Sequence, residues 1–117
     1  MEIDTKLQKL VEEFADAAVK ADTFTYENGR MARKYSNKEI ECWKKIRQLG
    51  DEGREALCRL LTDPRHSARI AAACYLLKFR TEQALAVLRE AAQHEGLVPF
   101  TASECLKRWE EGAWNLD

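Results

Sequence analysis

The chain has 117 residues, the length of a single domain, which can bury about two-thirds of the surface that the unfolded chain exposes. Hydrophobic residues make up 45% of the sequence and charged residues 33%, with only two prolines, and this composition excludes a disordered chain. A net charge of −1 excludes a strongly basic nucleic-acid binder. The chain has no apolar run of about 20 residues, which excludes a membrane-spanning helix. We therefore predict one domain over residues 1–117.

Charge is distributed unevenly along the chain. Residues 28–50 carry seven basic and two acidic side chains, whereas residues 1–27 and 81–117 each carry three basic and seven acidic ones. A basic centre between acidic ends affects the choice and steering of partners rather than the fold. Glu2 and Asp4 occupy positions where a secretory signal has basic residues, so we predict a cytoplasmic protein.

Helix-favouring residues dominate, and no segment alternates with the period of two that marks a half-buried strand, so we predict an all-α fold. The first helix should span residues 4–22, capped by Asp4 or Thr5, with one apolar face. That face consists of Ile3, Leu7, Leu10, Phe14, Ala17 and Ala18. The turn signal Asn28-Gly29 then predicts a break before the next helix.

The second helical stretch should cover residues 30–49 and end at Gly50, which suits a C-terminal cap. Its apolar stripe comprises Met31, Tyr35, Cys42, Trp43, Ile46 and Leu49. Most of its basic residues fall on the opposite side of the helix. The pair Ser36-Asn37, followed closely by Glu39, is able to restart a helix, so the sequence leaves open whether this stretch is one helix or two.

A third helix should span residues 52–62 with Asp51 as its cap.

The fourth helix contains an apolar run over residues 70–77, and this run predicts that it lies at the centre of the fold. Asp63 should cap the fourth helix, in which Pro64 takes the first position. Because a helix that is apolar on all sides cannot face water, this fourth helix must have neighbours on at least two sides.

Two further helices are predicted downstream. Thr81 should cap the fifth helix and Gly96 should close it, and Pro99 should open the sixth. The apolar positions are Ala84, Leu85, Leu88, Ala91 and Ala92 in the fifth helix and Ala102, Cys105, Leu106 and Trp109 in the sixth. Gly112 separates the sixth helix from a short tail that carries Trp114.

The apolar pattern of the third and fourth helices recurs in the fifth and sixth. Ala56, Leu57 and Leu60 of the third helix match Ala84, Leu85 and Leu88 of the fifth. Ala72 and Leu76 of the fourth helix match Ala102 and Leu106 of the sixth. A helix pair that recurs at a period of about 20 to 50 residues is typical of an α-solenoid. With the first two helices as a degenerate pair, the sequence predicts a short right-handed α-α superhelix of about six helices in three antiparallel pairs.

Part of this pattern resembles the turn and second helix of a HEAT repeat. The resemblance is carried by Leu60-Leu61, Asp63, Ala68-Arg69, Ala71-Ala72 and Leu76-Leu77. It implies that Asp63 and Arg69 hold the turn together. The last helix pair departs from the HEAT pattern, because residues 96–99 replace the aspartate turn and Ser103-Glu104 stands in place of further alanines.

Residues 7–114 also resemble a small bacterial HEAT-like family of unknown function. This wider resemblance rests on Gly50, on the block over residues 63–77 and on the closing segment over residues 109–114. Members of that family look like small stand-alone proteins, some of them encoded beside toxin genes. The resemblance therefore implies an immunity role as one expectation.

The sequence contains no recognisable catalytic motif. It has no Gly-rich phosphate loop, no His paired with Ser or Cys and no His-Glu-x-x-His run, so we predict a non-enzymatic protein without a cofactor. An enzyme would need a cavity that gathers polar groups from distant parts of the chain. His66 and His94 have no second ligand three or four residues away, which argues against a metal site. No Cys-x-x-Cys pair occurs, so we expect reduced core thiols at Cys42, Cys58, Cys74 and Cys105.

A basic stripe on the second helical stretch is the main candidate for partner binding. It comprises Arg30, Arg33, Lys34, Lys38 and Lys45, and we group Arg65 and Arg69 with it. Such a stripe suits an acidic protein or phosphates, but it also fits an ordinary solvated helix face. Trp114 either folds back over the sixth helix or anchors a partner, since tryptophan is enriched among interface hot spots. The predicted partner-binding residues are Arg30, Arg33, Lys34, Lys38, Arg65 and Trp114.

These features favour a non-enzymatic protein-binding module, and an immunity protein that neutralises a bacterial toxin is its most concrete version. The alternative is nucleic-acid binding, in which the basic middle segment contacts the phosphate backbone. A HEAT-like stack does bind DNA in the alkylpurine DNA glycosylase family, which uses a basic concave groove. The net charge of −1 and the acidic flanks weigh against this alternative.

Overall fold

The computed structural model describes residues 2–25, 27–93 and 100–112 of the chain. Within these ranges the structure has six α-helices, one 3-10 helix and no β-strand. The elements are α1 (Glu2–Phe24), α2 (Gly29–Gln48), α3 (Gly50–Leu57), the 3-10 helix η1 (Cys58–Thr62), α4 (His66–Leu76), α5 (Thr81–Gln93) and α6 (Phe100–Glu110). The prediction of an all-α fold is confirmed.

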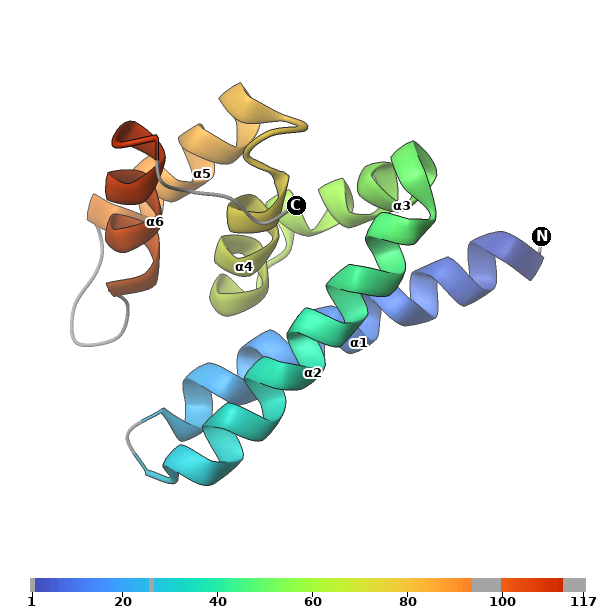
Figure 1. Ribbon diagram of the computed structural model, residues 1–117, viewed down its shortest axis with the longest axis horizontal. Coiled ribbons are helices and arrows are strands. Elements are labelled where there is room, and N and C mark those ends of the chain that lie inside the picture. The colour runs from blue at the N-terminus through green and yellow to red at the C-terminus, as the bar shows by residue number, and fades with distance from the viewer. Residues whose placement is uncertain (1, 26, 94–99, 113–117) are drawn as a thin grey trace.

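Helix α4 lies at the centre of the molecule, between the α1–α2 hairpin and the α5–α6 pair (Figure 1). It packs against α1, α5, α6 and the α3–η1 segment. Its buried residues are Ala68, Ile70, Ala71, Ala72, Ala73, Cys74 and Leu76. The prediction that this helix has neighbours on at least two sides is confirmed. The remaining helices pack as pairs, while a right-handed superhelix stays a prediction.

Helix α4 begins two residues later than the sequence predicted. Asp63 does not cap it, because the carboxylate of Asp63 accepts a hydrogen bond from the backbone N–H of Arg65 at 2.8 Å. This contact closes a turn before the helix, as aspartate side chains often do. Arg65 precedes the first helical residue, and its carbonyl accepts the first helical hydrogen bond, from Arg69 N–H at 3.0 Å.

Helix α2 is continuous, so Ser36 and Asn37 do not divide it. The side chain of Asn28 caps its start by accepting a hydrogen bond from the Met31 N–H at 3.2 Å. At the other end Gly50 has a φ of 68°, a left-handed conformation that glycine adopts at low cost, and this confirms its predicted role in ending the helix.

Other helix boundaries also differ from the prediction: α1 spans Glu2–Phe24 rather than residues 4–22, and α3 begins at Gly50, so Asp51 lies inside the helix and does not cap it. The predicted third helix over residues 52–62 changes from α-helix to 3-10 helix at Cys58, although Leu60 and Leu61 remain buried. The hydroxyl of Thr81 does not cap α5, since it donates backward to the Leu77 carbonyl at 2.6 Å. The predicted roles of Gly96, Pro99 and Trp114 fall on residues outside the described ranges.

Helix α3 passes so close to the end of α2 that Gly53 has no room for a side chain. A Cβ atom at this position would overlap the carbonyl oxygen of Ile46. Ile46 is fully buried, so α2 cannot shift without disturbing the core. Gly29, in contrast, has no atom near the position that its Cβ would take.

We predict that Gly53→Ala lowers the free energy of unfolding by about 1–3 kcal/mol, because the added methyl group must push the two helices apart. Urea denaturation followed by far-UV circular dichroism would measure the change. Gly29→Ala is the matched control, and it should leave the stability unchanged or raise it by up to about 1 kcal/mol. Equal effects of the two substitutions would contradict the close approach at Gly53.

Candidate functional site

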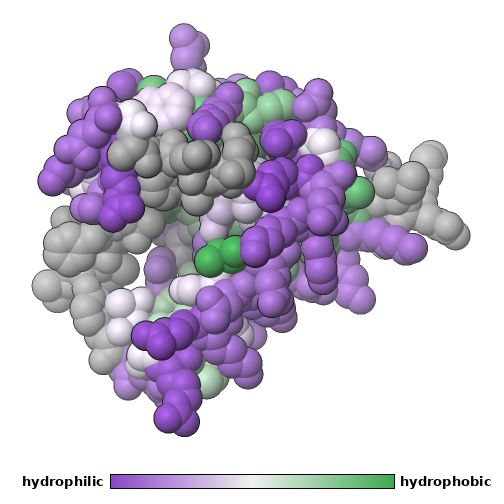
Figure 2. Space-filling view, viewed as in Figure 1, coloured by the Kyte–Doolittle hydropathy of each residue, from purple (hydrophilic) through white to green (hydrophobic). Residues whose placement is uncertain are grey.

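The outward surface of α2 is rich in cations. Its buried residues, Cys42, Trp43 and Ile46, fix the side that faces the core. Six basic side chains are exposed along the helix, and we call them the α2 basic face: Arg30, Arg33, Lys34, Lys38, Lys44 and Lys45. Hydrophilic side chains follow the course of α2 across the surface (Figure 2). Glu41 is an exposed acidic residue on the same helix.

None of these cations is ion-paired within the described part of the chain. Among residues 2–25, 27–93 and 100–112, no carboxylate forms an ion pair with any member of the α2 basic face. Lys34 lies over the Tyr35 ring, 5.7 Å from its centroid. Elsewhere, Lys20 pairs with Asp16 at 3.0 Å and Arg80 pairs with Glu55. The α2 basic face therefore carries an excess of positive charge, with six exposed cations and the single exposed acid Glu41 on the same helix.

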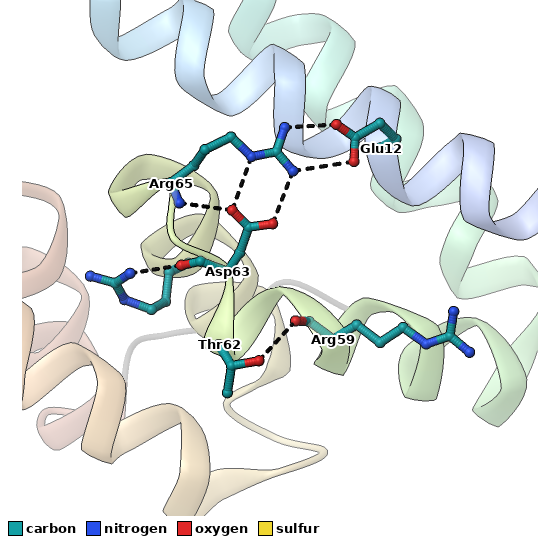
Figure 3. Close-up of polar contacts among 6 residues, drawn as sticks. Glu12, Arg59, Thr62, Asp63 and Arg65 are labelled. Atoms are coloured by element: carbon teal, nitrogen blue, oxygen red, sulfur yellow. Dashed lines mark hydrogen bonds and ion pairs between the residues drawn. The ribbon is translucent and has the colours of Figure 1, made fainter.

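Arg65 lies apart from the α2 basic face, between α1 and the start of α4 (Figure 3). Its guanidinium donates to both carboxylate oxygens of Glu12, at 2.7 and 3.2 Å, and to both of Asp63, at 2.9 Å each. These hydrogen bonds lower the pKa of Asp63 and raise that of Arg65. The guanidinium is thus already paired with two carboxylates, and its predicted role in partner binding stays a prediction.

Arg69 supports the same turn from within α4. Its guanidinium donates to the main-chain carbonyl of Asp63 at 2.7 Å and lies 2.8 Å from Nδ1 of His66. The expectation that Asp63 and Arg69 hold the turn together is confirmed. Arg69, like Arg65, is placed to stabilise the join between η1 and α4.

We predict that Arg65→Ala lowers the free energy of unfolding by about 1–2 kcal/mol, a value moderated by the partial exposure of the two ion pairs. Arg65→Lys should recover less than half of the loss, because lysine keeps the charge but cannot bridge two carboxylates with paired hydrogen bonds. Urea denaturation would measure the free energy of unfolding of both variants. Arg89→Ala, at an exposed position on α5, should change the stability by less than about 0.5 kcal/mol. A similar loss at position 89 would contradict a special role for Arg65.

A cavity of about 240 Å³ lies where α1, α2 and α4 meet. It is partly open to solvent and has a mixed apolar and polar lining. The lining residues are Ala18, Ala21, Asp22, Ser36, Glu39, Ser67, Ile70, Ala71, Cys74 and Tyr75. No local sequence pattern indicates this cavity, because its polar groups come from three helices and share no motif.

Glu39 is the lining residue most affected by its surroundings. Burial raises its pKa from 4.5 to about 7, a hydrogen bond with Tyr75 partly opposes the rise, and the charge of Asp22 adds to it. Burial also raises the pKa of the Tyr75 hydroxyl. The Tyr75 ring is fixed by Phe14, with ring centroids 5.4 Å apart, and by Trp43, at 5.0 Å. The carboxyl of Glu39 therefore has a rigid partner and titrates near neutral pH.

The chemistry available in this cavity is limited to acidic, hydroxyl and thiol groups. The Cys74 thiol is hydrogen-bonded to Cys105, and this bond and burial raise its pKa well above the ordinary value, so it is a poor nucleophile. No Lys, Arg or His belongs to the lining among the described residues. The cavity therefore has no cationic side chain to stabilise the negative charge that develops in acyl or phosphoryl transfer.

We predict that the stability falls by about 1 kcal/mol between pH 6 and pH 8 through Glu39 alone. Because the folded-state pKa lies above the unfolded value, the folded protein binds the proton more tightly, and this contribution is present at low pH and is lost as the pH rises through about 7. Urea denaturation at both pH values should show the fall in the native protein and not in Glu39→Gln. Glu41→Gln, at an exposed position on the same helix, should show the same fall in stability as the native protein. An unchanged fall in Glu39→Gln would contradict the raised pKa.

In the described part of the chain, no group of three or more His, Cys, Asp or Glu side chains is placed to hold a metal ion. No helix there is both long and apolar enough to cross a bilayer. None of the four cysteines forms a disulfide; Cys42, Cys74 and Cys105 are buried and Cys58 is partly buried.

A scan against protein-family models, a search of curated proteins and a search of solved structures each found no match for this chain. The class that the fold itself defines is a domain built of packed α-helices. Membership of a HEAT-like family stays a prediction based on the residues quoted above.

Proposed function

We propose that the protein is a non-enzymatic protein-binding module, and that its α2 basic face receives an acidic surface of a partner protein. The observation that carries this proposal is the set of six exposed cations on one helix, none of which forms an ion pair with a carboxylate among the described residues. Charge of one sign on one face attracts a complementary surface and orients it during encounter.

Two exposed apolar residues near the α2 basic face support an interface with a protein. Ile40 is 40% exposed and lies one turn before Lys44 on the same side of α2. Leu49, directly after the helix, is 47% exposed. Protein interfaces combine apolar contacts with a polar rim, whereas phosphate recognition alone does not need large aliphatic side chains.

An immunity protein that blocks a toxin is the most concrete version of this proposal. It is supported by the charge contrast between α2 and the acidic flanking segments, and by the sequence resemblance to a small bacterial HEAT-like family. Action in the cytoplasm is part of the proposal, and four cysteines that form no disulfide are consistent with a reducing compartment.

The proposal predicts that a triple variant, Arg30→Glu, Arg33→Glu and Lys38→Glu, loses at least about tenfold in affinity for the partner. The partner would be recovered from nuclease-treated native lysate with the wild-type protein, and its affinity would then be measured by calorimetry at two salt concentrations. The control triple variant, Lys9→Glu, Arg89→Glu and Lys107→Glu, makes the same change in net charge at exposed positions outside α2. It should bind like the wild type.

Three results would count against the proposal. The first is equal partner binding by the two triple variants. The second is tight, salt-dependent binding of a DNA or RNA probe that only the α2 variant loses, which would favour the nucleic-acid alternative. For the immunity version, the third is full activity of a toxin encoded by a neighbouring gene when the wild-type protein is co-expressed with it.

A further inference from the structure

The cavity between α1, α2 and α4 has the form of a small binding site on the inward side of α2. Its apolar wall is built by alanines of α1 and by Ile70 and Ala71 of α4, all of them buried. Its volume of about 240 Å³ lies below the roughly 300–1,000 Å³ of pockets that hold drug-sized ligands. A guest must therefore be small, with a short aliphatic part that can contact the alanines.

The charge in this cavity has one sign. Asp22 from α1 and Glu39 from α2 are its charged lining residues among those described, and both are acidic. The titratable groups that face Glu39 are Asp22 from α1 and Tyr75 and Cys74 from α4, and none of them is a cation. Ser36 and Ser67 add hydroxyl groups that can accept hydrogen bonds from a donor.

We propose that this cavity binds a small alkylammonium ion, whose nitrogen donates to the carboxylates of Asp22 and Glu39 and whose methylene groups lie against the alanine-lined wall. An ammonium group carries three donors and no acceptor, which matches a site that presents carboxylate and hydroxyl oxygens. The ion is either a free amine or the lysine side chain of another polypeptide, since both present the same chemistry. This site is separate from the α2 basic face and does not rest on the proposed function.

Binding of the cation must be linked to the titration of Glu39. An ammonium ion beside this carboxyl favours its charged form, so binding near neutral pH releases a proton and strengthens as the pH rises. With a pKa of about 7, the charged fraction of Glu39 increases about tenfold between pH 6 and pH 8. The affinity for an alkylammonium ion should therefore increase by up to about tenfold over this range.

The test uses n-butylamine as the probe, with n-butanol as its neutral counterpart of the same shape. Chemical-shift changes of the backbone amides of Ala18, Ser67 and Ala71 would locate the binding, and a titration at pH 6 and pH 8 would give the affinity. The variants are Asp22→Asn and Glu39→Gln, with Glu41→Gln as the matched control on the exposed side of α2. Far-UV circular dichroism would confirm that each variant is folded.

The expected result is that n-butylamine shifts the cavity amides and n-butanol does not. Each cavity variant should weaken binding at pH 8 by at least about tenfold, and Glu39→Gln should also remove the pH dependence. Glu41→Gln and the triple variant of the α2 basic face should bind like the wild type, so this proposal can fail or succeed independently of the proposed function.

A second arm compares n-butylamine with lysine that is blocked at both its amino and carboxyl ends. Tighter binding of the blocked lysine would identify the natural guest as a lysine side chain, and binding of n-butylamine alone would identify it as a free amine. Three outcomes would overturn the proposal: no shift of the cavity amides with n-butylamine, equal binding of n-butanol, or unchanged affinity in both Asp22→Asn and Glu39→Gln.

Discussion

The burial of most of α4 is the constraint on which the rest of the structure depends. Ala68, Ala72 and Ala73 have no exposed surface, and they are short enough for neighbouring helices to approach closely. Apolar surface on every side must be removed from water, so α1, α5 and the α3–η1 segment are all held against the same helix. The positions of α2 and α6 follow from these contacts, since each packs on a helix that α4 has already placed.

The parts of the fold that depend on local patterns could be predicted from the sequence. The apolar run over residues 70–77 predicted the central helix, because a helix that is apolar on all sides must be covered by neighbouring elements. Asn28 and Gly50 marked the ends of α2, since a side-chain cap and a left-handed glycine act within a few residues of their own position. Periodic stripes also gave most of the core, although Val11 and Ala15 are buried outside the predicted stripe of the first helix.

Features that depend on distant residues could not be predicted in this way. The pairing of Arg65 with Glu12, which lies 53 residues away in the chain, was missed because no local pattern links the two residues. The cavity was missed for a similar reason. Tyr75 was counted as part of an apolar run, yet its hydroxyl pairs with Glu39 from another helix. Neither contact leaves a local signal, and both become visible only when the helices are packed.

Helix α2 keeps two opposite electrostatic environments apart. Its exposed cations are surrounded by water, which screens them, and none of them is among the causes of the pKa shift of Glu39. That shift arises on the inward side, where burial and Asp22 make the charged carboxylate unfavourable. An acid at this position weakens the fold above its pKa, whereas an apolar residue would not. Strongly shifted pKa values are typical of binding sites, so we propose two separate functional surfaces for this helix, one at the inward acid and one at the outward cations.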